Sequence, residues 1–215
     1  MQYFNDVMNI LDSNTTSFLW MYITLFIISF FDTLIVVGAF FPASFFVIAA
    51  GFFSIHTGLD IWISIIVITL GGLIGDLLSY FIGLKGLNWF KGEKKLLKAS
   101  YLDKGEAFFE KYGDKSIIIG RFLGIIKSII PFVAGLYKMK FKKFLFLNIV
   151  AGLIWTIAHI VIGYILGRTL DVLNISKSVK LLIILIPFGL FFAWTLFEYR
   201  KKIFHFLINK KNIQN

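Results

Sequence analysis

Two basic residues, Arg121 and Lys127, interrupt an apolar stretch of this sequence. The stretch runs from Ser116 to Lys138 and reads SIIIGRFLGIIKSIIPFVAGLYK. A cation at the centre of a bilayer costs about 2.5 to 3.5 kcal/mol on insertion scales, so it needs a partner, an anion or water. Because a guanidinium binds phosphate through paired hydrogen bonds, we predict that Arg121 and Lys127 bind an anionic head group or a carboxylate. For Lys127, snorkelling to the membrane interface is the alternative.

Two acidic residues also lie in apolar segments. Desolvation destabilises a carboxylate and a nearby cation stabilises it, so Asp32 is suited to pair with a cation and to exchange protons. The alternative for Asp32 is a helix end at the membrane interface. Asp76 and Tyr80 share one helix face and form a second candidate polar site, in which Asp76 either exchanges protons or joins two helices.

The sequence lacks the common motifs of hydrolases and nucleotide-binding enzymes. It has no Walker loop, no Gly-x-Ser-x-Gly elbow and no His-Glu-x-x-His motif, and His56, His159 and His205 are scattered. We therefore expect no enzymatic activity, no cofactor and no metal site. We assign His159, Asn148 and Trp155 to packing between helices.

The composition is that of an integral membrane protein. Of the 215 residues, 58% are hydrophobic and the mean hydropathy is +0.83, whereas a soluble domain is about 45 to 50% apolar. The formal net charge is +10, and most basic residues lie beside apolar segments, at 85–115, 138–143 and 200–211. This placement favours a cytoplasmic membrane surface over nucleic acid as the partner. Cysteine is absent, which excludes disulfides and cysteine-ligated metals.

The lengths of the apolar segments predict an all-α, multi-pass membrane protein. A membrane-spanning helix needs about 20 apolar residues. We predict one membrane domain over residues 17–200, with spans over residues 17–31, 61–84, 144–167 and 181–199. Residues 1–16 lack the basic start of a signal peptide and predict an interfacial amphipathic helix, and residues 201–215 predict a basic cytoplasmic tail.

Two further segments, 32–53 and 116–137, are too interrupted for ordinary spans. An opened backbone at membrane depth is tolerated only inside protein or beside a water-filled cavity, so each segment predicts a re-entrant helical hairpin. Basic clusters flank 116–137 on both sides, which predicts that both of its ends, and the carboxyl terminus, are cytoplasmic. The residues expected to break the hairpin helices are Pro42, Gly51, Gly120, Gly124, Pro131 and Gly135.

Two segments predict helix packing and surface binding. Gly72, Gly75, Ser79 and Gly83 recur at spacings of three and four, which gives a helix a smooth face for close packing. Residues 86–115 mix charges of both signs with large apolar side chains, which is typical of amphipathic helices on the cytoplasmic surface.

A weak repeat relates the two halves of the sequence. Gly72-Leu73-Ile74 and Ile82-Gly83 recur as Gly152-Leu153-Ile154 and Ile162-Gly163, and each copy follows an Ala-Gly pair. Because the two helices are predicted to cross in opposite directions, the halves would form an inverted repeat. Transporters of this design bind substrates between paired broken helices. A chance match among Gly, Leu and Ile is the alternative.

These residues resemble the DedA family, also called SNARE-associated or VTT-domain membrane proteins. The segments that carry the resemblance are FFPASFFVIAAG, GGLIGDLLSYFIGLKG and GRFLGIIKSIIPFVAG, followed by Phe141, Phe144, Asn148, Gly152 and Trp155. The resemblance covers roughly residues 28–168. It implies the family fold, an inverted repeat of two re-entrant hairpins.

The resemblance also implies roles for single residues. The family acid before the first hairpin falls on Asp32. This chain has Ser44 where the family has a second acid, a departure that implies weaker proton coupling. The two family arginines fall on Arg121 and Lys127, and a family proline is replaced by Gly124. Family members are implicated in moving lipids, including polyprenyl phosphates and phospholipids, and in proton-dependent drug tolerance.

Lipid translocation in a bacterial inner membrane is the function that these features favour. Arg121 and Lys127, with Ser44 and Tyr80, are the candidate residues for binding an anionic, phosphate-bearing lipid. Asp32 and Asp76 are the candidates for coupling a flippase or scramblase to protons. The alternatives are a proton-coupled exporter of small cations or drugs and a non-transporting scaffold. The expected partners are membrane lipids and protons, not nucleic acid, and a homo-oligomer stays open.

Overall fold

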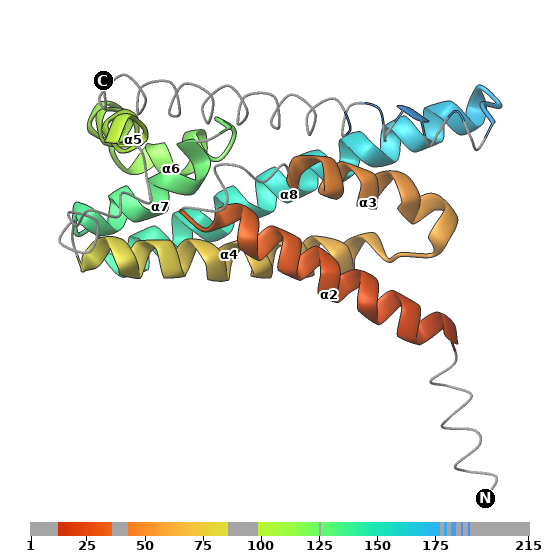
Figure 1. The fold of residues 1–215 in the computed structure, drawn as a ribbon, viewed down its shortest axis with the longest axis horizontal. Helices are drawn as coiled ribbons and strands as arrows, with labels where there is room; N and C mark the ends of the chain where they lie inside the picture. Colours follow the sequence, from red (N-terminus) through yellow and green to blue (C-terminus); the bar gives the residue numbers. More distant parts are fainter. Residues whose placement is uncertain are drawn as a thin grey trace, which may run out of the picture. The chain divides into compact units, whose positions relative to one another are not determined.

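The computed structural model describes residues 13–35, 43–85, 99–124 and 126–176, with isolated positions between 179 and 189. The chain divides into two compact units, 1–167 and 168–215. The predicted all-α class is confirmed, because the described residues form helices and no strand (Figure 1). The elements are α2 Ser13–Thr33, α3 Ala43–Thr57, α4 Ile61–Leu84, α5 Ala99–Tyr112, η2 Gly113–Lys115, α6 Ser116–Gly120, α7 Ile126–Leu136 and α8 Phe141–Val172.

Several predicted features fall outside the described residues. They are residues 1–12 of the interfacial helix, Pro42, residues 86–98, most of the span over 181–199, and the basic tail.

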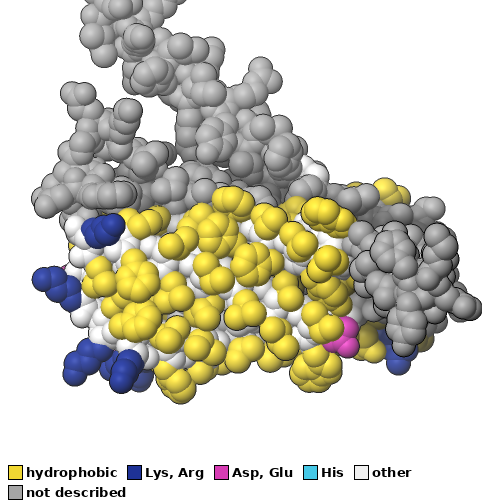
Figure 2. Space-filling model, turned by 90° about the horizontal axis from the view of Figure 1, so that it is seen from below, with side chains coloured by type: hydrophobic (Ala, Val, Ile, Leu, Met, Phe, Trp, Pro, Cys, Tyr) yellow, Lys and Arg dark blue, Asp and Glu magenta, His cyan; other side chains and the backbone are white. Residues whose placement is uncertain are grey.

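Among the described residues, two helices, α4 and α8, are long and apolar enough to cross a membrane. α4 coincides with the span predicted over 61–84, and α8 extends the span predicted over 144–167 at both ends. With 24 residues at about 1.5 Å each, α4 matches the thickness of the hydrocarbon core. Figure 2 shows an apolar face with most of its Lys and Arg side chains gathered at one end, and with an acidic and a further basic side chain near the other. This pattern is that of a protein surface in contact with lipid.

The sequence at 58–60 explains where α4 begins. Gly58 has φ +74°, a left-handed conformation that glycine adopts at little cost. The side chain of Asp60 then accepts a hydrogen bond from the backbone N–H of Ile63 at 2.9 Å. This N-cap satisfies one of the free donors at the start of the helix.

Glycines bring α7 against α4 at backbone distance. A Cβ on Gly83 of α4 would collide with the carbonyl oxygen of Phe132 on α7. In the reverse direction, a Cβ on Gly135 of α7 would collide with the carbonyl oxygen of Tyr80 on α4. The close packing predicted for the small face of α4 is therefore present.

The same contact recurs between α3 and α8, which lie alongside each other (Figure 1). A Cβ on Gly163 of α8 would collide with the carbonyl oxygen of Ile48, and one on Gly51 of α3 with that of Ile160. Gly83 and Gly163 are the equivalent positions of the sequence repeat. The repeat therefore corresponds to two matching helix pairs, α4 with α7 and α8 with α3.

The break in the second hairpin segment lies between α6 and α7. α6 ends at Gly120, and Gly124 has φ +42°, so these two glycines lie at the predicted break. Pro131 was wrongly expected to break a helix, because it lies inside α7. Gly51 and Gly135 also lie inside helices, where they permit the close contacts described above.

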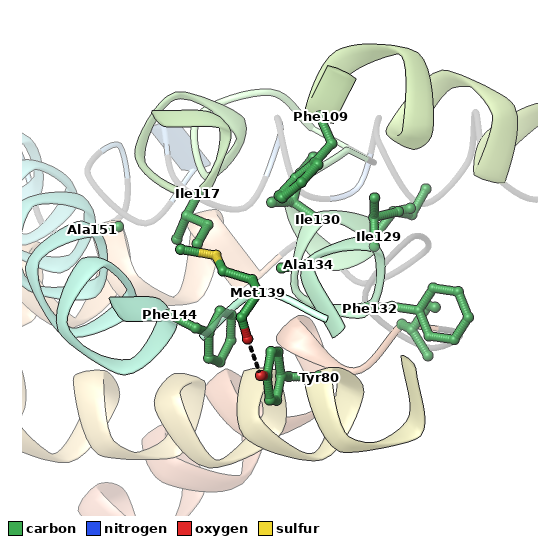
Figure 3. Close-up of a cluster of buried hydrophobic side chains, with 12 residues drawn as sticks. Tyr80, Phe109, Ile117, Ile129, Ile130, Phe132, Ala134, Met139, Phe144 and Ala151 are labelled. Atoms are coloured by element: carbon green, nitrogen blue, oxygen red, sulfur yellow. Dashed lines mark hydrogen bonds between the residues drawn. The ribbon is translucent and has the colours of Figure 1, made fainter. Parts of the chain in front are cut away.

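A buried apolar cluster holds α5, α7 and the start of α8 together (Figure 3). A Cβ on Gly105 of α5 would lie within 2.5 Å of the Ile129 side chain, so α5 packs closely on α7. The Tyr137 hydroxyl donates to Glu110 at 2.8 Å. These contacts join α5, which precedes α6, to α7, which follows the helix break.

Candidate functional site: a buried ionic pocket

Arg121 is the first residue after α6 and lies at the helix break. Its side chain is buried, and Nη1 donates to Asp76 Oδ2 at 2.6 Å and to Asn148 Oδ1 at 2.9 Å. Asp76 comes from α4 and Asn148 from α8. One guanidinium nitrogen therefore connects the hairpin to both long helices.

Two glycines make room for the other end of the guanidinium. A Cβ on Gly72 of α4 would lie 2.9 Å from Arg121 Nη2, and one on Gly152 of α8 would lie 3.5 Å from it. Gly72 and Gly152 are equivalent positions of the repeat. The repeat therefore places a small residue from each long helix beside the same cation.

Lys127, in the first turn of α7, forms the second ion pair. Its Nζ lies 2.6 and 2.8 Å from the two carboxylate oxygens of Asp32. The ammonium also lies 5.1 Å from the centre of the Trp155 ring, within the range of a cation–π interaction. The backbone N–H of Ala43, at the start of α3, donates a hydrogen bond to Asp32.

The two ion pairs share one small pocket. Its lining residues are Ser29, Asp32, Thr33, Asp76, Arg121, Lys127 and Trp155.

The hydroxyl groups in this pocket are already bonded to the backbone of α4. Ser29 Oγ donates to the carbonyl oxygen of Ile68 at 2.7 Å, and Thr33 Oγ1 to that of Gly72 at 3.0 Å. The remaining cavity is about 10 Å³, which is about the room that one water needs. In this arrangement the pocket is closed, and two cations are balanced by two carboxylates.

Comparison with known proteins gives a family for this architecture. The VTT domain matches residues 41–165. Protein DedA of Escherichia coli K12 is 34% identical over 169 residues, which cover 77% of this chain and 76% of DedA. The chain belongs to the DedA family.

Other relatives of this DedA-family protein are also named as membrane proteins. The inner membrane protein YqjA of E. coli K12 is 25% identical over 78% of this chain and 77% of its own length. An uncharacterized membrane protein of Mycobacterium tuberculosis is 36% identical over 56% of this chain and 53% of its own length. No solved structure matches the chain.

The DedA-family fold brings four predicted site residues together, with one change in partners. Asp32, Asp76, Arg121 and Lys127 line a single pocket. The sequence pointed to Asp32 as the carboxylate partner of Arg121, but Arg121 pairs with Asp76 and Lys127 pairs with Asp32. Asp76 therefore joins α4 to the hairpin as well as carrying a charge.

Tyr80 and Ser44 do not line the pocket of this DedA-family protein. The Tyr80 hydroxyl donates to the carbonyl oxygen of Met139 at 2.5 Å, and its ring stacks on Phe144 in the apolar cluster (Figure 3). Ser44 lies in the first turn of α3, next to the residue whose N–H reaches Asp32. The structure gives Tyr80 a packing role instead of a place beside the cations.

Two residues assigned to packing contribute to the site: Trp155 lines the pocket, and Asn148 accepts a hydrogen bond from Arg121. With Gly152 they occupy positions i, i+4 and i+7 of α8, which lie on one helix face. This spacing was the sequence signal for a shared site. Asn148 also has an amide nitrogen without a hydrogen bond of normal geometry, close to the Asp76 carboxylate. His159 packs as expected, with its ring 4.0 Å from that of Trp155.

Proposed function

We propose that this protein moves an anionic, phosphate-bearing lipid across a bacterial inner membrane. The observation that supports this most directly is the pair of buried cation–carboxylate bridges in one pocket at a helix break. Buried cations in an apolar protein are costly unless they are paired. A polyprenyl phosphate or a phospholipid supplies the anion that such cations bind, while its hydrocarbon stays in the membrane.

The ion pairs suggest how protons drive this movement. Protonation of Asp32 removes its negative charge and weakens its hold on Lys127. Lys127 is then available for a phosphate oxygen, and the same exchange applies to Asp76 and Arg121. When the carboxylate loses its proton, the carboxylate competes with the phosphate and releases it. A proton and an anionic head group therefore occupy the site together and leave it together.

The location rests on the relatives and on the apolar surface. YqjA is named an inner membrane protein, and α4 and α8 are long enough to span. We propose that this chain is a multi-pass protein of a bacterial inner membrane, and the basic residues at 200–211 favour a cytoplasmic carboxyl terminus. Its partners in this proposal are membrane lipids and protons, and it moves lipids without chemical change.

Re-entry of the second hairpin can be tested with single cysteines, since the chain has none. Cysteines at Lys111 and Lys140 should react with an impermeant thiol reagent from the same side of intact vesicles. A cysteine at Asp60, before the span α4, should react only from the other side. Labelling of Lys111→Cys and Lys140→Cys from opposite sides would show that residues 116–137 cross the membrane.

Asp32→Asn should weaken the dependence of transport on protons, and Asp32→Asn combined with Asp76→Asn should abolish it. An amide keeps the size of the carboxylate but cannot change its charge, so the rate of the double variant should be flat between about pH 6 and pH 8. The initial transport rate at both limits of that range measures the effect. Asp60→Asn, at the exposed cap of α4, is the matched control and should keep the wild-type profile. An unchanged dependence of the rate on pH in Asp32→Asn would show that a group other than Asp32 binds the proton.

Purified protein in vesicles tests the function itself. The wild type should accelerate translocation of labelled polyprenyl phosphate or anionic phospholipid, and leave an uncharged diacylglycerol at the protein-free rate. The double variant Arg121→Ala with Lys127→Ala should lose this acceleration. If no phosphate-bearing lipid moves faster with wild-type protein than without it, the proposal is wrong.

A second candidate function is proton-coupled export of small cations or drugs. The observation that favours it is that the same pocket holds two buried carboxylates, Asp32 and Asp76. A cation could take the place of Lys127 or Arg121 beside them. Efflux of a lipophilic cation driven by a pH gradient, without lipid movement, would favour this candidate. A non-transporting scaffold would show neither activity.

A further inference from the structure

An apolar groove lies between α2 and α3. Its volume is about 300 Å³, and Leu25 and Ile28 of α2 face Phe46, Ala49 and Phe53 of α3 across it. Thr24 is the polar side chain in its lining, and the Thr24 hydroxyl already donates to the carbonyl oxygen of Trp20 at 2.8 Å. The lining of the groove is therefore almost entirely apolar and suits hydrocarbon.

The groove and the ionic pocket meet on α2. Ile28 lines the groove, and the next residue, Ser29, lines the pocket. Asp32 lies one turn further along the same helix, about 6 Å beyond Ile28 at about 1.5 Å per residue. The two sites are therefore within the reach of one molecule with a charged end and an aliphatic chain.

The groove also opens toward the apolar surface of the protein. Trp20, which lines the groove, is 63% exposed, and neighbouring Ile23 and Ile27 of α2 are exposed as well. A chain can therefore enter sideways from the hydrocarbon core of a membrane. An aqueous route to the groove is not required.

We propose that the groove holds a hydrocarbon chain of the same lipid whose phosphate binds in the ionic pocket. This inference rests on the proposed function for its head group and adds the site for its tail. Lipid tails are as apolar as the groove, so burial in it is not driven by the hydrophobic effect. The groove positions the chain, and the charged head group supplies the selectivity.

Photo-crosslinking tests this inference without a transport assay. The protein is reconstituted in vesicles that contain phosphatidic acid with a diazirine on one acyl chain, irradiated, and digested for mass spectrometry. Adducts should concentrate on groove residues such as Phe46 and Phe53. They should exceed adducts on Ile66 and Leu70, which lie on the exposed face of α4.

Ala49→Phe is the critical variant. A ring at this small residue fills the groove, and because protein interiors are close-packed, the chain is excluded and groove adducts should fall at least about fivefold. Ile23→Phe adds a ring to α2 outside the groove and should leave the adducts unchanged. Ala49→Leu adds a smaller side chain and should lower the groove adducts to an intermediate level. This variant keeps the test informative if Ala49→Phe fails to fold.

The head group is tested with a second probe. Groove adducts from phosphatidic acid should fall in Arg121→Ala, whereas adducts from a diazirine diacylglycerol should be low in every protein. Groove labelling that depends on Ala49 but accompanies no transport would support the tail site and count against the proposed function. Groove labelling no higher than that of α4 would overturn the inference, and would leave the groove to a protein segment or a second copy.

Discussion

Replacement of Arg121 by lysine should lower lipid transport at least tenfold. Nη1 of Arg121 already serves Asp76 and Asn148, and when protonation of Asp76 releases Nη1, the guanidinium can offer both of its terminal nitrogens to one phosphate. A lysine ammonium keeps the charge but cannot reproduce this planar, paired geometry. A charge-assisted hydrogen bond contributes about 1.5 to 3 kcal/mol, and about 1.4 kcal/mol is a factor of ten.

The matched control for this change is Lys127→Arg. It restores the residue that the family resemblance implies at this position, so transport should be retained or improved. The measurement is the initial rate of phosphate-lipid translocation per molecule of folded protein. Full transport by Arg121→Lys would count decisively against paired hydrogen bonds to a phosphate.

Replacement of Asp76 should destabilise the fold by about 3 to 5 kcal/mol. Asp76→Leu leaves the Arg121 guanidinium buried without its carboxylate, and breaking a buried ion pair on one side costs this much. The exposed fraction of Arg121 is 9%, so water cannot easily replace the lost partner. The effect is measured by thermal unfolding in detergent of the wild type, of Asp76→Leu, of Arg121→Met and of the protein that carries both changes.

The double variant Asp76→Leu with Arg121→Met should recover most of the lost stability. Two apolar residues in place of a buried pair are often neutral or stabilising by about 1 to 4 kcal/mol. The double variant should nevertheless fail to transport, because it has no cation for the phosphate. A double variant as unstable as Asp76→Leu alone would mean that the ion pair does not couple these residues.

A charge exchange separates pairing from ligand binding. The geometry shows that the informative exchange is Asp76→Arg with Arg121→Asp, since Asp32 pairs with Lys127 and not with Arg121. The exchanged protein should regain folding, yet remain inactive, because its cation has moved to α4. Recovered transport would indicate that the pair is structural and that the head group binds elsewhere.

Local features of the site were predictable from sequence because their causes are local. An apolar run of 24 residues defines α4, and a cation in an apolar segment has few explanations, so Arg121 was identified before its surroundings were known. The break at Gly120 and Gly124 follows from backbone freedom in that same segment. Each of these conclusions needs only a window of neighbouring residues.

The ion-pair partners were not predictable, because they depend on which helix faces meet. Asp32 and Asp76 are both carboxylates in apolar helices, and only the packing of α4 against the hairpin decides that Asp76 reaches Arg121. The role of a glycine was not predictable for the same reason. Gly135 suits either a break or a close contact, and the position of the Tyr80 carbonyl, 55 residues away in sequence, decides between them.

In this pocket the carboxylates of the two ion pairs compete with an entering anion for the cations. Each cation already holds a carboxylate at 2.6 Å, so an entering anion must replace that carboxylate before any affinity is observed. For every 1.4 kcal/mol by which the internal pair is favoured, the apparent affinity of an anion falls about tenfold. Chloride carries a single charge and forms no directional set of hydrogen bonds, so it should displace the carboxylates from the cations only weakly. A phosphate that arrives together with a proton meets a weaker competitor, and without a ligand the four charged residues that line the pocket are all paired, which leaves no free charge there for small ions.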